Sequence, residues 1–535
     1  MKLPKLPFTI QHRKEDTIQF FGLNLTQNTR EGEFADMGGL STSNYPVITQ
    51  RPMRGQYTTY HDVQDVYVWD GHLYVIDNIY DAPLYKPILK KDGVDIYDIA
   101  LTSGTKQMAV INSKLVIFPD KVYYDMITGD IVPFVELDWT ATTWDIIISG
   151  SSETFSLKAE GIASKVKAGD VIDIQAQGLT ARRAVVQGVS AGQTPADDAI
   201  GLLKSAVTFD PPYSGSLNIK GSFPDLDFIC SSGNRIWGCN IEENTIYASA
   251  LGDPTDFFRY SLGDIGPYAV TVGSEGPFTG ICEYNGTVCA WKEKILHKIL
   301  GKFPSEYYMD DSNIDGLQKG SERSLTVIDQ TLYYKGINGV YAYTGGRPQS
   351  ISYNLGNGIY TNAVGGTDGL KYYIGMTNPA GVSHLYAYDL KHGFWAIEDV
   401  GGESYTAMTN KDNQLHMVFQ QDGIGKLRRV EQGVLESQQW FGEFVPTYEN
   451  IFNRKGYLRL LIRMTMTAGS TVTVKVKEDD GAWKTVWQQT AANLVPVMVP
   501  VRLGRCDKYT LRLEGTGEVT IRAIGREYVT GSVIN

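Results

Sequence analysis

Short runs in which apolar and polar side chains alternate fill most of the chain, and turn-forming residues separate them. The alternation is clearest at residues 456–463 (GYLRLLIR), 471–476 (TVTVKV) and 518–524 (EVTIRAI). A period of two places every second side chain on one face, so these runs predict half-buried β-strands. A helical period is almost absent, and residues 197–207 (DDAIGLLKSAV) are the one segment that we expect to form a helix. The pattern predicts an all-β protein.

One unit of about 40–50 residues recurs along the chain, and this spacing is typical of propeller blades. Each copy has a polar turn, a short apolar strand, a second turn and a strand that often reads Ile/Val/Leu-Tyr. Such a repeat predicts a β-propeller of roughly seven blades. Six or eight blades stay open, because the N-terminal segment can complete a blade. The first strands of the copies centre on Leu73, Leu115, Ile236, Val288, Leu332, Tyr372 and Leu415.

A long gap interrupts the repeat between its second and third copies. The step from Leu115 to Ile236 is almost three times the usual spacing. Removing residues 139–222 restores a single period, and this stretch has its own alternating runs at 168–174 and 182–186. We therefore predict a small β-barrel domain at 139–222, inserted between propeller segments at 61–138 and 223–435.

The two ends of the chain lack the repeat. Residues 436–535 alternate strongly and predict a C-terminal β-sandwich. Residues 1–60 are punctuated by glycine and proline, which favours an extended N-terminal arm.

Composition narrows the class of protein further. The 535 residues are 42% hydrophobic and 20% charged, which is typical of a globular chain and not of a disordered one. Lys and Arg number 49 against 60 Asp and Glu, giving a net charge of −11. This balance argues against a protein that grips nucleic acid through its phosphates. No uncharged apolar run approaches the roughly 18 residues of a membrane helix, so no membrane segment is expected.

Cysteine usage gives no sign of a redox or zinc site. The five cysteines are an odd number, and their spacings fit neither a zinc ribbon nor a CxxC pair. We expect a protein made and folded in a reducing cytoplasm.

One segment matches a calcium-loop pattern. Residues 311–322 follow the spacing D-x-[DN]-x-[DN]-G-x5-E, whose oxygen ligands suit Ca²⁺. Lys319 would oppose the ion, and the flanks are not helical, so a polar loop between blades is the alternative interpretation. Apart from this loop the sequence predicts no cofactor. The four candidate metal ligands are Asp311, Asn313, Asp315 and Glu322.

No catalytic motif is recognisable in the sequence. The chain has no G-x-S-x-G, no H-E-x-x-H and no P-loop, and its seven histidines are scattered. The sequence therefore predicts a protein that is not an enzyme. A glycosidase is the enzyme alternative, because propellers can gather a pair of carboxylates from different blades.

Three strings of residues resemble tailed-phage stabilisation proteins, the propeller-bearing nozzle or hub proteins of short-tailed phages. The first covers residues 20–52, with FFGLN at 20–24, REGEFADM at 30–37 and YPV at 45–47. The second runs from NRIWG at 234–238 to IYASALGDPTDF at 246–257. The third begins at Ser324 and ends with GVYAYTGG at 339–346. The resemblance covers most of residues 17–435 and transfers no catalytic residue.

This resemblance implies a structural virion protein, located in the tail and assembled in the host bacterial cytoplasm. Such a protein forms a homo-oligomeric ring at the tail or head–tail connector, closes the DNA channel and supports DNA ejection. Its expected partners are other tail and connector proteins: a portal-proximal adaptor and tail fibres or spikes. Packaged DNA would pass without specific binding, which the excess of acidic residues suits.

A binding module is the alternative to this structural role. In that hypothesis the C-terminal sandwich or an aromatic face of the propeller binds a receptor or glycan at the tail tip. A protein that cleaves glycans is the less favoured form of the same idea.

Overall fold

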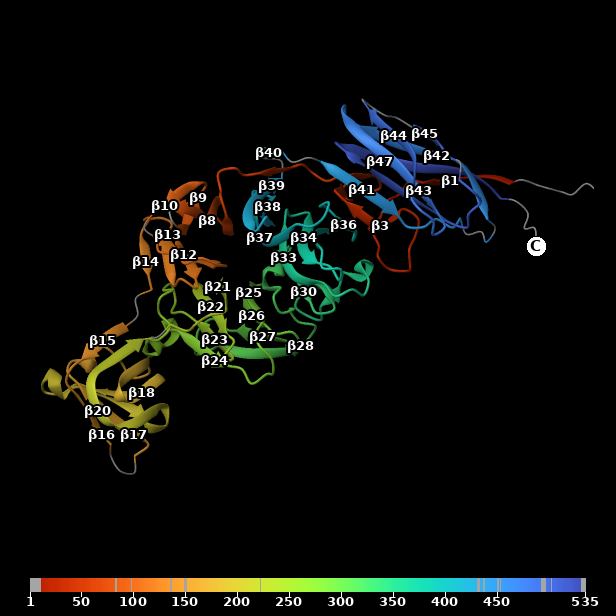
Figure 1. Ribbon diagram of the computed structural model, residues 1–535. Helices are drawn as coiled ribbons and strands as arrows, with labels where there is room; N and C mark the ends of the chain where they lie inside the picture. Colours follow the sequence, from red (N-terminus) through yellow and green to blue (C-terminus); the bar gives the residue numbers. More distant parts are fainter. Residues whose placement is uncertain are drawn as a thin grey trace, which may run out of the picture. The chain divides into compact units, whose positions relative to one another are not determined.

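The computed structural model describes residues 11–81, 84–97, 99–134, 137–148, 152–221, 223–430, 434–435, 438–449, 452, 454–491, 497–501 and 503–530. The chain forms two compact units (Figure 1). One comprises Met1–Asp95 with Arg323–Asn535, and the other comprises Ile96–Glu322. Almost all of the regular structure is β, with only short 3-10 turns between strands. Among the described residues, no helix has the length and apolar character needed to cross a membrane.

Three antiparallel sheets of four strands make up most of the second unit, and each strand pairs with the next along the chain. The strands are β11 (Gln107–Ile111), β12 (Lys114–Phe118), β13 (Val122–Asp125) and β14 (Ile131–Pro133); β21 (Phe228–Ser232), β22 (Arg235–Asn240), β23 (Thr245–Ala248) and β24 (Tyr268–Thr271); and β25 (Gly280–Tyr284), β26 (Thr287–Trp291), β27 (Ile295–Leu300) and β28 (Tyr308–Asn313).

Four similar sheets belong to the first unit. Their strands are β7 (Val63–Trp69), β8 (His72–Asp81), β9 (Leu84–Lys91) and β10 (Val94–Ile96); β29 (Thr326–Ile328), β30 (Thr331–Gly336), β31 (Gly339–Tyr343) and β32 (Gln349–Ser350); β33 (Thr361–Thr367), β34 (Lys371–Thr377), β35 (Ser383–Asp389) and β36 (Trp395–Ile397); and β37 (Ser404–Lys411), β38 (Gln414–Gln421) and β39 (Ile424–Val430) with β6 (Arg54–Gln56) and β40 (Val434–Leu435).

These seven sheets have the form of propeller blades, as the repeat predicts, with three in the second unit and four in the first. Within each unit the first strands of successive sheets lie next to one another: β11, β21 and β25 in one unit, and β29, β33, β37 and β7 in the other. The polar turn of each repeat is the hairpin between the first and second strands. Asn285 and Gly286, for example, both have positive φ, 50° and 75°, as a tight two-residue hairpin requires.

The last blade is completed by the N-terminal segment. Strand β6 pairs antiparallel with β39, with Arg428 opposite Gln56. A strand from one end of the propeller sequence thus joins the sheet formed by the other end, and the blade count stays at seven among the described residues.

Two six-stranded sheets form the β-sandwich of the first unit, and both draw strands from each end of the chain. Their inward side chains share one core, which contains Phe34, Met37, Val474 and Ile462. The strands are β1 (Gln11–Thr17), β4 (Leu40–Ser41), β5 (Ile48–Gln50), β42 (Lys455–Met466), β45 (Val497–Pro500) and β47 (Val519–Thr530) in one sheet, and β2 (Gly22–Leu23), β3 (Glu33–Gly38), β41 (Gln439–Phe444), β43 (Ser470–Glu478), β44 (Lys484–Ala491) and β46 (Tyr509–Thr516) in the other.

The predicted extended arm at residues 1–60 is therefore wrong for the part of it that the structure describes. Strand β1 pairs with β47 over seven residues, and β3 pairs with β41. Phe20, Leu23 and Phe34 are fully buried in the sandwich core. Glycine and proline mark the bends between these short strands and not a solvent-exposed arm, because the strands find their partners far away in the sequence.

The inserted sheet runs from Leu137 to Gly221 and wraps around its own apolar core. Its strands are β15 (Leu137–Ala141), β16 (Trp144–Ile147), β17 (Thr154–Ala159), β18 (Val171–Ser190), β19 (Ala199–Leu203) and β20 (Val207–Gly221). The predicted helix at 197–207 is wrong. This segment is strand β19 between two 3-10 turns, with Ile200 and Leu202 buried at period two.

Candidate functional site

A serine, a histidine and an aspartate form a hydrogen-bonded chain in the second unit. The Oγ atom of Ser274 lies 2.8 Å from Nε2 of His297, and Nδ1 of His297 lies 2.6 Å from Oδ1 of Asp311. Ser274 lies in the loop that follows β24, His297 is in β27, and Asp311 is in β28. Each hydrogen bond is short enough for proton transfer between the groups that it joins.

The register of the fourth blade aligns the histidine and the aspartate. His297 and Asp311 are directly opposite in the antiparallel β27–β28 pair. The His297 side chain is fully buried, and its ring contacts the edge of Phe278 with centroids 6.2 Å apart. Burial and the aspartate together fix the orientation of the imidazole.

The hydrogen-bond donors among Ser274, His297 and Asp311 follow from the chemistry of the three side chains. An ionised carboxylate only accepts hydrogen bonds, so Nδ1 of a neutral His297 carries the proton and donates to Asp311. Nε2 is then the unprotonated nitrogen, and it accepts from the Ser274 hydroxyl. In this tautomer the histidine is placed to receive the serine proton.

Two polar side chains hold the loop that carries Ser274 by hydrogen bonds to its backbone. The Lys292 ammonium donates to the Ser274 carbonyl oxygen at 2.8 Å and to Oδ1 of Asn244 at 2.8 Å. Asn244 in turn donates to the carbonyl oxygens of Ser274 and Val272. Burial lowers the pKa of Lys292. The loop therefore holds the serine in place beside a fixed positive group.

The four predicted calcium ligands are not brought together. Asp311 accepts from His297, and Asn313 lies in β28 opposite Ile295, so half of the expected loop is a paired strand. Glu322 lies in a separate 3-10 turn. Within the described ranges, no three His, Cys, Asp or Glu side chains form a group that could hold a metal ion.

Gly316 of the same pattern has a packing role. A Cβ atom at this position would lie 2.0 Å from the Lys292 carbonyl oxygen, and its own N–H donates to the Glu293 carbonyl. A glycine is needed here for close approach of two backbones, which explains its presence without an ion.

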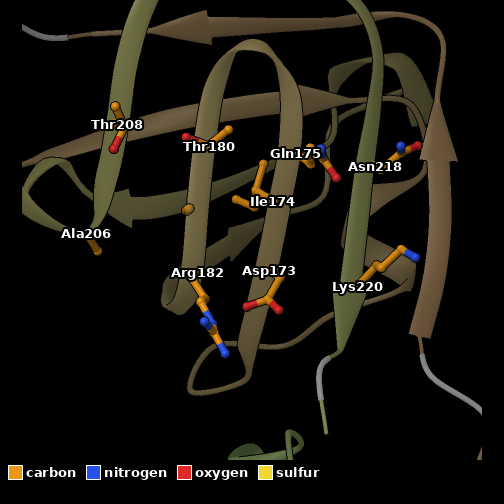
Figure 2. Close-up of a pocket in the computed structure, with 10 residues that line it drawn as sticks. Asp173, Ile174, Gln175, Thr180, Arg182, Ala206, Thr208, Asn218 and Lys220 are labelled. Carbon is orange, nitrogen blue, oxygen red and sulfur yellow. The ribbon is translucent and has the colours of Figure 1, made fainter. Parts of the chain in front are cut away.

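A polar pocket lies in the inserted sheet, with a volume of about 460 Å³. Figure 2 shows Asp173 and Arg182 pointing toward the same end of it. Asp173 accepts from the Arg183 backbone N–H, and Lys220 pairs with Asp138 at 3.5 Å. The side chains that line the pocket are mostly hydrogen-bonding groups: Asp173, Gln175, Thr180, Arg182, Thr208, Asn218 and Lys220.

A second pocket lies at the first hairpins of the blades in the second unit. Its volume is about 590 Å³, and Glu283 is the one carboxylate that lines it. Glu283 accepts from the Gly286 backbone N–H. Glycoside hydrolysis uses two carboxyl groups, so this pocket does not supply the pair that a glycosidase needs.

No sequence motif predicts the hydrogen-bonded serine, histidine and aspartate. Ser274, His297 and Asp311 lie on three different segments, and no short motif spans them. The one available hint was the length of the β27–β28 hairpin, since pairing residues 295–300 with 308–313 places His297 opposite Asp311.

Comparison with known proteins gives no family. No protein-family model matches the chain, and no curated protein matches it.

Several solved structures are similar at low identity. The β-propeller domain of Myceliophteria thermophila Cps50 (Swd1) is 8% identical, covers 70% of this chain and 98% of its own, and has a TM-score of 0.29. Kluyvelomyces marxianus Hsv2 is 8% identical over 65% and 97%, with a TM-score of 0.26. An exo-β-1,3-galactanase from Phanerochaete chrysosporium is 10% identical over 86% and 96%, with a TM-score of 0.23. These similarities carry no inference about function.

Proposed function

We propose that the chain is a structural virion protein of a tailed bacteriophage. It forms a homo-oligomeric ring at the tail or head–tail connector, closes the DNA channel and supports DNA ejection. The observation that carries this proposal is the place of the phage-like strings in the fold. Several of their residues are buried and hold strands of the fold together.

The first string holds the N-terminal segment in the sandwich. Phe20, Phe34 and Met37 are fully buried in its core. A Cβ atom on Gly22 would lie 2.3 Å from the Trp395 carbonyl oxygen, so this glycine permits the segment to lie directly against blade strand β36. The string therefore ties a blade to the sandwich in one unit.

The second string supplies buried side chains that hold one blade together. The guanidinium of Arg235 is buried and donates to the carbonyl oxygens of Ser249 at 2.7 Å and Asp264 at 2.6 Å. Trp237 and Phe257 of the same string are also buried. Residues that resemble the family thus stabilise a rigid body, which is what a load-carrying ring component requires.

The charge of the chain supports the same function. A net charge of −11 suits a wall that DNA passes without binding. In this proposal the neighbours are a portal-proximal adaptor and the tail fibres or spikes.

Quantitative mass spectrometry of purified virions of the source phage tests the proposal. We expect this chain at a fixed, small integer ratio to the portal protein, because a ring component has a defined copy number. Absence of the chain from virions would overturn the proposal.

Glycan binding at the tail tip is the second candidate function, and the pocket of Figure 2 favours it. Its volume suits a small ligand, and its hydrogen-bonding side chains suit the hydroxyl groups of a saccharide. A glycan array separates the two functions. A saccharide signal that is lost in Asp173→Ala and kept in Lys158→Ala, outside the pocket, supports binding, whereas a purely architectural ring gives no signal.

A further inference from the structure

We propose that Ser274 is a nucleophile activated by His297, and that this site hydrolyses short-chain acyl esters. Asp311 is the positioning residue that orients the histidine. This activity goes beyond the architectural function proposed above, and it departs from the expectation, drawn from the sequence, of a protein without catalysis.

The geometry meets the requirement for an activated serine. A nucleophile needs a base within hydrogen-bond reach, and the base needs a third group that orients it. Ser274 Oγ is 2.8 Å from His297 Nε2, and Asp311 accepts from the other ring nitrogen at 2.6 Å. The same three roles recur in serine hydrolases of unrelated folds, where they are recognised by geometry and not by sequence order.

Other histidines of the chain show that this arrangement is specific. Histidine–aspartate pairs also occur at His61, His72, His384 and His392. In the described part of the chain, none of these four has a serine at its second ring nitrogen. A histidine–aspartate pair is therefore a common structural feature here, and the added serine distinguishes the site at His297.

The surroundings of Ser274 indicate the size of the substrate's acyl group. Gly273 and Gly276 flank the serine, and a Cβ atom on either would meet no atom within 4 Å. Gly273, Glu275 and Pro277 are exposed, and Ser274 itself is partly exposed. An open loop gives a bulky ester room to approach, and it suits a short acyl group that needs no apolar channel. The class that fits is an acetyl or similarly short ester of a larger alcohol.

A fixed positive charge lies beside the reacting serine. The Lys292 ammonium is held at the Ser274 carbonyl oxygen, 2.8 Å away. This bond fixes the backbone of the nucleophile's residue, which keeps the Ser274 hydroxyl in position beside His297.

The reaction follows from these positions. The Ser274 oxygen attacks the acyl carbon of the ester while its proton passes to Nε2 of His297. The carbon–oxygen bond to the alcohol then breaks, and the imidazolium gives the proton to the departing oxygen. A water molecule attacks the acyl-serine with the same base, and this step releases the carboxylic acid and restores the serine hydroxyl.

Covalent labelling of the full-length chain with a fluorophosphonate probe tests the inference. We expect one adduct, mapped by peptide mass spectrometry to Ser274, and release of p-nitrophenol from p-nitrophenyl acetate. Because the adduct is mapped on the unchanged chain, the result does not depend on the stability of a variant. Ser274→Ala should abolish both signals. Ser305→Ala, an exposed serine in the β27–β28 loop of the same blade, should keep them.

Asp311→Asn separates positioning from structure. We expect it to slow labelling of Ser274 on the order of 10³–10⁴-fold, because the histidine loses the partner that selects its tautomer. Its thermal midpoint should change little, since the Asp311 side chain is 51% exposed. No adduct at Ser274, or an unchanged labelling rate in Asp311→Asn, overturns the inference. Either result leaves the ring proposal intact, because labelling does not require the virion.

Discussion

Several buried charged side chains in the first unit are held in ion pairs. Arg526 is the clearest case, since its guanidinium binds Glu449 through Nη2 at 2.7 Å and Glu31 through Nη1 at 2.7 Å. The side chains of Arg526 and Glu449 are 3% and 1% exposed. This cluster links the N-terminal segment, the segment after β41 and strand β47.

The Glu31 carboxylate and the Arg526 guanidinium shift each other's pKa. Burial raises the pKa of Glu31, but hydrogen bonds from Arg526 and Thr17 outweigh it, so the pKa is lowered overall. Burial opposes the charge on Arg526, while the hydrogen bonds that it donates to Glu449 and Glu31 raise its pKa. Both groups are therefore charged in the folded protein at neutral pH.

Replacing Arg526 should strongly destabilise the first unit. Arg526→Met leaves the buried Glu449 carboxylate without its partner, at a cost of about 3–5 kcal/mol in the free energy of unfolding. Arg454→Met is the matched control, because Arg454 and Asp479 are an exposed pair worth about 0–1 kcal/mol. Differential scanning calorimetry at pH 7 compares the two, and equal thermal midpoints would contradict the prediction.

The ion pair between Glu31 and Arg526 makes the stability of the first unit depend on pH. A carboxyl whose pKa is lowered on folding stabilises the protein above its unfolded value, and this stabilisation is lost as the pH falls through the folded value. For Glu31 the loss begins below 4.5. The difference in thermal midpoint between wild type and Arg526→Met should therefore shrink below that pH. A difference that stays constant between pH 7 and pH 3.5 would argue against Glu31 as a contributor.

Part of the calcium-loop pattern lies in a β-strand. Residues 311–313 are the end of β28 and pair with β27, so the Asp311 and Asn313 side chains lie two positions apart on one face of an extended strand instead of converging on one point. A strand spaces side chains differently from a calcium-binding turn. In this structure the Asp311 carboxylate therefore accepts a hydrogen bond from His297.

The short N-terminal strands have no stable structure of their own. β2 and β4 are two residues long and pair with their near neighbours β3 and β5, which in turn pair with the distant strands β41 and β47. Gly39, with φ of 69°, approaches the Gln439 carbonyl so closely that a Cβ atom would lie 2.2 Å from it. At this scale the glycines of the segment serve close packing between strands.

The inserted sheet is the part of the molecule best suited to removal. Its two ends are adjacent, because Leu137 and Gly221 are direct partners in the β15–β20 pair. It also has its own core, which includes Phe155, Leu179 and Ile219. We expect a chain in which a short Gly/Ser linker replaces residues 137–221 to fold, and we expect the isolated segment to fold as well.

Calorimetry and circular dichroism check this prediction. The shortened chain should keep the remaining transitions of the full chain with a modest loss of stability, since removal uncovers Phe258, whose carbonyl oxygen accepts from the Val171 N–H at 3.0 Å. The control replaces residues 455–516 with the same Gly/Ser linker. This change removes strands from both sandwich sheets, so the control should not fold. Aggregation of the shortened chain would show that the insert is not independent.

The sequence by itself determined the blade-forming hairpins and their spacing. Alternation at period two, turns such as Asn285-Gly286 and the spacing of the repeats are local signals, because each hairpin joins strands that are neighbours in the chain. The position of the inserted sheet followed from the same spacing.

Only the tertiary structure decided which distant residues meet. Gln11 pairs with Thr530, and β6 completes a blade whose other strands begin at Ser404, yet no local pattern specifies such partners. The candidate site has the same origin, since Ser274 reaches His297 from the preceding blade's loop. Backbone pairing and core packing between remote segments create these contacts, so their chemistry becomes visible only once the chain is folded.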